Sequence, residues 1–383
     1  MDITGIICEY NPLHLGHKKQ FDMVKSRYPD TGIVCLMSGN YVQRGYPAVI
    51  DKSLRAEAAI LSGADLVLEL PVTASLSSAE GFASEGVRIL SGFCNRLCFG
   101  AESADKETLL TTAQALLSDT FPEKLRAELD KGASFPVARQ AALQAMGIQN
   151  DTLSLPNNIL ATEYCKAILQ QKSPMEPMPI IREGSYHDTA IDEENPSATA
   201  LRACIAKEED WLQYVPETAR PVFTGANIHT LSAGEQAILY RLRTMTDAEF
   251  EALPYGSEGL WRKLMHNARK CATLEEIITA TKSKRYTRTR LDRMVMCAFL
   301  GITQADMDTP APYARVLALN DRGREILKSA REVGLFPNAG EWVDSPYQVL
   351  EHRVGMIYSL FCVGESTPCR EEDRRIYYKK EMA

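Results

Sequence analysis

Short apolar runs alternate with amphipathic segments through the first hundred residues. Four runs have the length and aliphatic content of strands, and they span residues 3–8, 32–37, 66–70 and 97–100. The segments between them place apolar residues at helical spacing, at 17–28, 51–62 and 78–90. Asp51 is a suitable N-cap for the second of these helices. Apolar strands that alternate with helices predict an α/β fold, with a parallel sheet covered on both faces. Ligands of such sheets bind at the carboxyl ends of the strands.

The rest of the chain is predicted to be mostly helical. Residues 105–175 show helical spacing, a short strand is expected at 178–182, and a helix begins near Ser197. Beyond residue 231, helices are expected at 233–240, 246–253, 256–270, 273–281 and 287–300, followed by a strand at 315–319 and a helix at 323–333. The change of pattern between residues 205 and 225 predicts two domains, 1–210 and 211–383.

Composition and charge narrow the class of protein. The chain has 383 residues and a net charge of -7, so any surface for nucleic acid must be a local patch. The first residues resemble no secretory signal, and no apolar run approaches the roughly 20 residues of a membrane span. We therefore expect a cytoplasmic protein that contacts no membrane and keeps its ten cysteines reduced. Cys94 and Cys98 lack a second Cys/His pair at ligand spacing, so no zinc site is expected.

Two histidines mark the turn between the first strand and the first helix. His14, Gly16 and His17 stand where a helix start offers free N–H groups and the positive end of its dipole. Gly16 allows close backbone approach, and two imidazoles three residues apart can stabilise charge on a departing pyrophosphate. No Lys-Ser/Thr P-loop is present. The alternative is that both histidines only cap the helix.

The segment His14-Leu15-Gly16-His17 resembles the HxGH signature of the nucleotidyltransferase superfamily. The longer string from Gly5 to His17 resembles the bacterial tRNA(Met) cytidine acetate ligases, and the resemblance covers essentially the whole chain. It implies a Rossmann-like nucleotidyltransferase core followed by a mostly helical C-terminal domain. It also implies that this loop binds ATP, with contacts from Ile7, Cys8, Glu9, Tyr10, Asn11, Pro12, Leu13, Leu15, Gly16, Lys18, Lys19 and Gln20, and with His14 and His17 as catalytic residues.

Further candidates for the ATP site follow the later strands. Arg44, in the loop after the second strand, is expected to act on phosphate because arginine binds phosphate through two parallel hydrogen bonds, although a solvated arginine is the alternative. Lys52 is expected either near the phosphates or in an exposed ion pair. By resemblance, Gly100, Arg182 and one asparagine contact ATP; we favour Asn157 over Asn158.

Two further groups lie after the strand at 178–182. His187 beside Asp188 suggests either an oriented base or a structural pair. Ser197, Thr199 and Arg202 resemble the second signature of the superfamily and are expected at the β- and γ-phosphates, although Ala200 replaces a hydroxyl residue there.

A basic segment occupies positions 282–293. Six basic residues and one acidic residue, Asp292, give it a local charge of +5 within an acidic chain. Arg290 and Arg293 share a helix face, and Tyr286 can stack on a base. The predicted tRNA-binding residues are Lys282, Lys284, Arg285, Tyr286, Arg288, Arg290 and Arg293. The alternative is a solvated run of charges.

The residues alone predict adenylation with an RNA partner, and the resemblance implies the rest. Acetate would attack ATP, with Mg²⁺ carried by the nucleotide, to form acetyl-adenylate. The wobble cytidine of elongator tRNA(Met) would then take the acetyl group as N4-acetylcytidine, without acetyl-CoA. Two alternatives are a nucleotidyltransferase that adenylylates a small phosphorylated metabolite and a non-enzymatic ATP-binding RNA adaptor.

Overall fold

A seven-stranded sheet forms the centre of the computed structural model, which describes residues 1–102, 105–149, 152–181, 196–283, 285–330, 336 and 345–380. The strand order is β7-β6-β1-β2-β5-β8-β9. The parallel part consists of β1 (Ile3–Cys8), β2 (Gly32–Ser38), β5 (Leu66–Leu70), β6 (Arg96–Ala101) and β7 (Glu176–Ile181). These five strands lie close to their predicted bounds, and the α/β fold is confirmed.

The register brings the carboxyl ends of the parallel strands to one edge. Cys8 pairs with Met37, Ser38 with Leu70, and Ala101 with Ile181. The loops that follow these strands therefore meet at the same place, which is where an α/β sheet binds its ligand.

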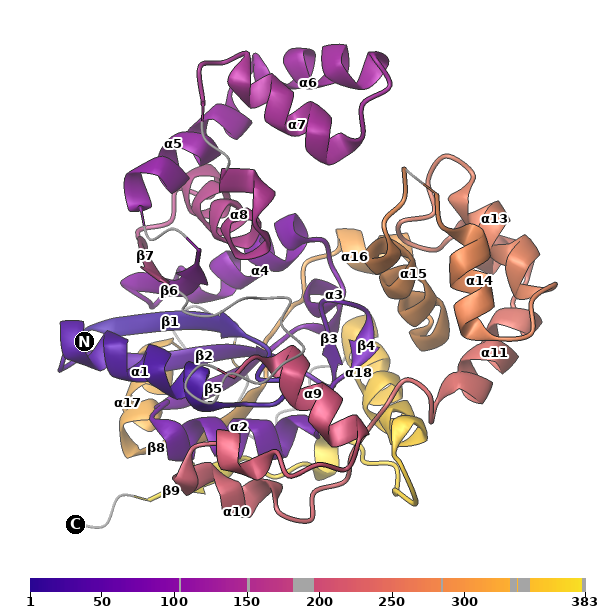
Figure 1. Cartoon of the computed structure of the whole chain (residues 1–383). Coiled ribbons are helices and arrows are strands. Elements are labelled where there is room, and N and C mark those ends of the chain that lie inside the picture. The colour runs from indigo at the N-terminus through magenta and orange to yellow at the C-terminus, as the bar shows by residue number, and fades with distance from the viewer. Residues whose placement is uncertain are drawn as a thin grey trace.

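Helices cover both faces of the sheet, as alternating strand residues require. One face packs against α4 (Ala79–Leu90), α5 (Lys106–Leu117), α8 (Pro156–Gln170) and α17 (Asp321–Ala330). The other packs against α1 (Leu15–Arg27), α2 (Lys52–Ser62), α9 (Ala198–Ala206) and α10 (Arg220–Phe223). Figure 1 shows α4 and α8 above the sheet and α2 and α10 below it. Asp51 and Ser197 cap α2 and α9, as predicted.

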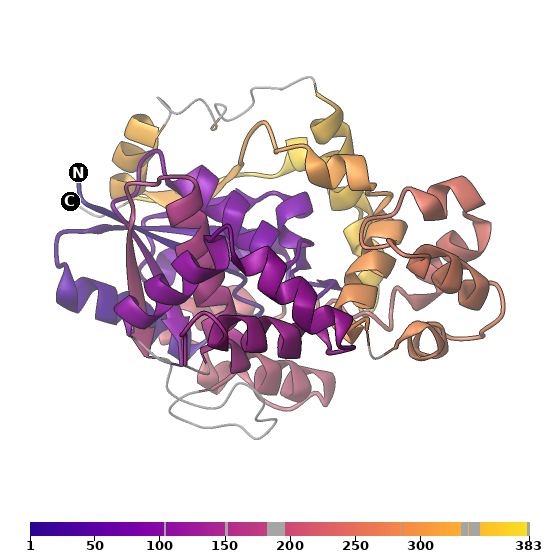
Figure 2. The same cartoon turned by 90° about the horizontal axis from the view of Figure 1, so that it is seen from above.

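A second group of helices has its own apolar core. Its members are α11 (Glu235–Thr244), α12 (Asp247–Glu251), α13 (Leu260–Ala268), α14 (Leu274–Thr281), α15 (Arg288–Leu300) and α18 (Pro346–Ile357). The short α16 (Gln304–Asp308) follows α15. In Figures 1 and 2, α11 to α15 stand to one side of the sheet rather than over either face.

A short helix and a small hairpin follow the strands β5 and β2. The helix α3 (Val72–Ser75) follows β5, and β3 (Tyr41–Val42) pairs with β4 (Tyr46–Pro47) in a small antiparallel hairpin. Figure 1 shows α6 (Phe121–Asp130) and α7 (Phe135–Gln144) projecting beyond α5 and α8.

The sheet takes its last two strands from the C-terminal part of the chain. The strand β8 (Val316–Asn320) pairs antiparallel with β5, and β9 (Tyr377–Lys379) pairs parallel with β8. The proposed division at residue 210 stays a prediction, and the sheet itself crosses it. None of the helices in the described ranges has the length and hydrophobicity that a membrane span requires.

Candidate functional site

A cavity of about 330 Å³ opens at the carboxyl edge of the parallel strands. Its volume falls within the range of small-molecule sites. The predicted ATP-site residues that line it are Ile7, Cys8, Glu9, Tyr10, Asn11, His14, Gly16, His17, Lys19, Gln20, Arg44, Gly100, Asn157, Ser197, Thr199 and Arg202. The structure thus brings together residues from both signatures, from the loops after β1 and β2, from the end of β6 and from the start of α8.

Four predicted ATP contacts do not line this cavity: Pro12, Leu13, Leu15 and Lys18. Leu13 is fully buried in the apolar core beneath α1, because its side chain points inward where the loop enters the helix. Lys18 pairs with Asp22 one turn further along α1. Arg182, His187 and Asp188 lie outside the described residues.

The two signature histidines cap α1 and line the cavity at the same time. The Nδ1 atom of His14 accepts the Gly16 N–H at 3.1 Å, and the Nδ1 atom of His17 accepts the His14 N–H at 3.2 Å. Their rings stack with centroids 3.8 Å apart. Because both Nδ1 atoms accept, a neutral ring carries its proton on Nε2. The capping and phosphate-binding interpretations are therefore compatible, with Nε2–H as the donor for a ligand.

Gly16 permits this stacked arrangement. A Cβ atom at this position would lie 3.0 Å from Cε1 of His14. A side chain would therefore push the ring of His14 away from its capping position, which explains the glycine between the two histidines.

A second helix start faces the same cavity. Ser197 caps α9 by accepting the Ala200 N–H at 3.0 Å, and Ser197 and Thr199 line the cavity. Arg202 donates to the backbone oxygen of Asn11 at 2.7 Å and to the Thr199 hydroxyl at 3.1 Å. Two helix N-termini and a guanidinium thus converge on one space, which favours a polyanionic ligand such as a triphosphate.

The opposite wall is the β3–β4 hairpin. Val42, Gln43, Arg44, Tyr46 and Pro47 line the cavity from this side. The N–H of Gln43 donates to Oε1 of Glu9 at 2.7 Å, which joins the hairpin to the end of β1. Burial raises the pKa of Glu9, although the Gln43 N–H and the charges of Arg202 and Arg44 oppose the rise.

Glu102 contacts both asparagines at the start of α8, each in a different way. The Asn157 side chain lines the cavity and donates to Oε1 of Glu102 at 2.9 Å. Asn158 is buried, and its Oδ1 atom accepts the Glu102 N–H at 3.0 Å. The geometry therefore favours Asn157 as the asparagine that meets a nucleotide.

One end of the cavity is apolar, and the sequence did not predict it. Beside Gly100, this end is lined by Phe82, Phe99, Leu160, Tyr164, Ile180 and Ile181. These residues come from α4, β6, α8 and β7, and in the sequence they look like ordinary core positions. Together with Gly100 they form an apolar surface suited to an adenine ring.

Arg55 was also missed as a positioning residue. It is fully buried and donates to the backbone oxygens of Glu9 at 2.5 Å, Ser38 at 3.1 Å and Ile50 at 2.8 Å, as well as to that of Gly39. One guanidinium thus joins the ends of β1 and β2 to the start of α2. Burial lowers the pKa of Arg55, although Tyr358, Asp51 and Glu9 oppose this shift.

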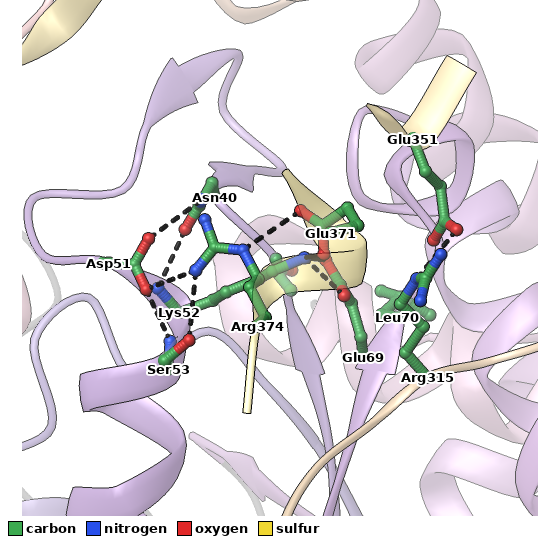
Figure 3. Close-up of polar contacts among 12 residues, drawn as sticks. Asn40, Asp51, Lys52, Ser53, Glu69, Leu70, Arg315, Glu351, Glu371 and Arg374 are labelled. Carbon is green, nitrogen blue, oxygen red and sulfur yellow. Dashed lines mark hydrogen bonds and ion pairs between the residues drawn. The ribbon is translucent and has the colours of Figure 1, made fainter. Parts of the chain in front are cut away.

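Lys52 does not reach the phosphate cavity. It forms an ion pair, as one alternative expected, but the pair is buried: Nζ lies 2.6 Å from Glu69 and 2.7 Å from Glu371. In Figure 3 its side chain points between these two carboxylates. The partners are far apart in sequence, so spacing along the chain could not indicate them.

Further charges complete this buried ion network, which we define as Asp51, Lys52, Glu69, Glu371 and Arg374. Arg374 lies between Asp51, at 2.8 Å, and Glu371, at 3.3 Å. Burial alone would raise the pKa of Glu371, but Lys52 and Arg374 outweigh it and hold that pKa below its usual value. The network fastens the C-terminal segment beneath the loop that carries the β3–β4 hairpin.

Several residues of the predicted tRNA-binding segment form hydrogen bonds and ion pairs with other parts of this chain. Arg285 and Tyr286 contact Glu258, while Arg288 makes a two-point contact with Glu275 at 2.6 and 2.7 Å. Lys282 is exposed, and Lys284 lies outside the described residues. These contacts neutralise part of the positive charge that the segment exposes to solvent. RNA binding by this segment stays a prediction.

The last two arginines of the segment point to different partners. Arg290 donates to the backbone oxygen of Tyr255 at 2.8 Å, whereas Arg293 reaches the backbone oxygen of Gln43 at 3.4 Å. Arg293 therefore lies at the hairpin of the cavity rather than on the open face of α15. Among the described residues, no group of three His, Cys, Asp or Glu side chains is arranged to hold a metal ion.

Comparison with known proteins agrees with this geometry. The chain matches the HIGH Nucleotidyl Transferase family over residues 1–361. The tRNA(Met) cytidine acetate ligase of Clostridium acetobutylicum is 37% identical over 360 residues, covering 88% of this chain and 89% of that protein. The protein of the same name from Clostridium novyi is 38% identical over 357 residues, with the same coverage of both chains.

Two solved structures are similar over nearly the whole chain. Thermotoga maritima TmcAL in its apo form has a TM-score of 0.91 and 29% identity, covering 100% of both chains. Thermotoga maritima TmcAL bound with alpha-thio ATP has a TM-score of 0.87 and 28% identity, covering 99% of this chain and 100% of that one. The protein described here therefore belongs to the HIGH nucleotidyl transferase family, and within it to the tRNA(Met) cytidine acetate ligases.

Proposed function

We propose that this protein is an ATP-dependent ligase that activates acetate as acetyl-adenylate and acetylates the wobble cytidine of elongator tRNA(Met). One observation carries the adenylation step. The starts of α1 and α9, with His14, His17 and Arg202, surround a single cavity at the carboxyl edge of the sheet. The names of the relatives support acetate and tRNA(Met) as the other substrates.

In the first step, an acetate oxygen attacks the α-phosphorus of ATP and the bond to the bridging oxygen of pyrophosphate breaks. Negative charge grows on the departing pyrophosphate. The Nε2–H groups of His14 and His17 and the guanidinium of Arg44 are the donors that we assign to this charge. Magnesium would enter with the nucleotide and neutralise phosphate oxygens.

We assign the adenine to the apolar end of the cavity. Gly100 and Asn157 lie there, and the rings of Phe99 and Tyr164 pack with centroids 5.3 Å apart. This assignment puts the adenine beside β6 and the phosphates beside α1 and α9. The α-phosphate then falls near the histidine pair.

In the second step, the exocyclic amine of cytidine attacks the acyl carbon of acetyl-adenylate. The bond from that carbon to the phosphate oxygen breaks, AMP leaves, and the attacking amine loses a proton to solvent, which yields N4-acetylcytidine. The acyl group comes from free acetate, so the reaction requires no acetyl-CoA. We assign RNA contact to the 282–293 segment, where Lys282 and Arg285 are the most exposed described cations, and we place the reaction in the cytoplasm.

Exchange of labelled pyrophosphate into ATP tests the first step. We expect exchange that depends on acetate and proceeds without tRNA. Exchange that instead requires a phosphorylated metabolite would identify a nucleotidyltransferase of small molecules. ATP binding with neither kind of exchange, with or without tRNA, would leave only a non-enzymatic RNA adaptor.

A further inference from the structure

The β3–β4 hairpin lies between the ATP cavity and the helical group. One side of it supplies Gln43, Arg44 and Tyr46 to the cavity wall. Its tip contacts α15, which belongs to the separate apolar core of the helical group. The hairpin is therefore held by residues about 250 positions further along the chain.

A buried side-chain contact joins the hairpin to α15. The hydroxyl of Tyr46 donates to Oδ2 of Asp292 at 2.9 Å, and Asp292 is 3% exposed. The other carboxylate oxygen of Asp292 accepts from Nε of Arg288 at 3.1 Å. Asp292 thus links a residue of the cavity wall to a basic residue on the surface of α15.

Backbone contact supports the same link. Gly45 has a φ of +83°, and a Cβ atom there would lie 2.5 Å from the backbone nitrogen of Arg293 and 2.5 Å from the carbonyl carbon of Asp292. The hairpin tip therefore lies directly on the backbone of α15, with no room for a side chain between them. Arg293 adds a hydrogen bond to the backbone oxygen of Gln43 at 3.4 Å.

The hairpin has only a short β-ladder of its own. Its two strands have two residues each, so its position depends on what surrounds it. On the cavity side, the Gln43 N–H is held by Glu9. On the opposite side, the hairpin contacts Asp292 and Arg293 of α15, and Tyr41 at its start is buried in the core of the helical group. Displacement of groups in a reacting site by about an ångström can reduce catalysis about a hundredfold.

We propose that Asp292, together with the backbone of α15 at Gly45, is a positioning element for adenylation, so that the helical group forms part of the acetyl-adenylate site before any RNA binds. This inference rests on the proposed function for its activity readout. Under this proposal, Arg293 holds the hairpin and is not one of the RNA-contacting residues of the 282–293 segment.

The test compares variants on both sides of the contact. Asp292→Ala removes the acceptor, Asp292→Asn keeps an acceptor of the same shape, and Gly45→Ala moves the hairpin without changing any side chain of α15. Thr289→Ala, on the same helix with its hydroxyl near that of Thr287, is the matched control. Each variant is first checked for native circular dichroism and thermal unfolding.

Acetate-dependent pyrophosphate exchange is then measured without tRNA. We expect Asp292→Ala to raise the KM for ATP roughly tenfold, as loss of a buried hydrogen bond to a charged group would. Gly45→Ala should raise the KM in the same direction, because its Cβ atom would displace the hairpin from α15. Asp292→Asn should recover most of the wild-type KM, and Thr289→Ala should match the wild type. A merely structural role would reduce the number of active molecules and leave the KM unchanged.

Direct titration with ATP separates this inference from the proposed function. If the wild type binds ATP but shows no acetate-dependent exchange, the proposed function fails, and the ATP affinities of the variants still test the positioning role. If folded Asp292→Ala and Gly45→Ala both show the wild-type KM and the wild-type affinity for ATP, the positioning role is wrong. Should Asp292→Ala fail to fold, Gly45→Ala alone decides.

Discussion

Lys52→Met removes the central cation of the buried ion network and keeps an unbranched apolar side chain. Lys52 is 3% exposed, and its Nζ contacts Glu69 at 2.6 Å and Glu371 at 2.7 Å. Methionine fills most of the same volume. The substitution therefore leaves two carboxylates buried without the ammonium that lies between them.

The expected cost follows from this geometry. Removing one partner of a buried ion pair destabilises a protein by about 3–5 kcal/mol, because the remaining charge stays desolvated. This is a large part of the roughly 5–15 kcal/mol by which native proteins are stable. Lys328→Met is the matched control, because its pair with Glu325 is more than half exposed on both sides (61% and 54%) and such pairs contribute about 0–1 kcal/mol.

Urea unfolding followed by circular dichroism measures the difference. The C-terminal segment that carries Glu371 should also become more sensitive to protease in the variant, because the network fastens it. Lys52 holds the pKa of Glu371 below its usual value against the effect of burial. A carboxyl group whose pKa is lower in the folded than in the unfolded state stabilises the folded protein at pH values above its unfolded pKa. This contribution is lost as the pH falls. The deficit of Lys52→Met should therefore be largest at neutral pH and shrink in acid.

A free energy of unfolding of Lys52→Met within about 1 kcal/mol of the wild-type value at neutral pH would contradict this prediction. A deficit that stays constant as the pH falls would also contradict it, because it would trace the loss to packing instead of charge. Destabilisation of Lys328→Met by the same amount would show that neither burial nor the network matters.

Three further predictions concern pH, catalysis and RNA. Glu351 is a buried residue of α18 that accepts hydrogen bonds from Tyr313 and Arg315, and burial raises its pKa to about 7. The stability that depends on its protonated carboxyl is present below the unfolded pKa and is lost as the pH rises through about 7. The unfolding free energies of the wild type and Glu351→Gln should therefore diverge across this window, and a pH-independent difference would contradict the prediction. His17→Ala should slow acetate-dependent pyrophosphate exchange about 10²-fold while ATP still binds, and unchanged exchange would remove this histidine from catalysis. Replacing Lys282 and Arg285 together by Ala should weaken tRNA binding and flatten its salt dependence; equal losses in exchange and RNA binding would show a structural role.

Strong local patterns made the core of the fold predictable. Buried parallel strands such as Ile3–Cys8 are continuous apolar runs, and the caps Asp51 and Ser197 are residues that commonly begin helices. The two histidines around Gly16 were recognisable because their chemistry is contained in one loop. The cavity indeed forms at the strand ends that the alternation predicts.

Contacts between distant parts of the chain were not predictable in this way. Lys52 and Glu371 are 319 residues apart, and nothing in their neighbourhoods indicates that they meet. The return of β8 and β9 to the sheet edge is equally hidden, because a short strand among helices carries no signal of its partner. Arg293 shares a helix face with Arg290, yet only packing shows that it contacts the hairpin.

Mass spectrometry of tRNA incubated with this protein, ATP and isotopically labelled acetate follows the complete proposed reaction. We expect one labelled acetyl group on the wobble cytidine of elongator tRNA(Met), formed only when ATP is present and accompanied by AMP and pyrophosphate. Unlabelled tRNA under conditions in which the protein binds ATP, or label that appears only when acetyl-CoA replaces acetate, would contradict it.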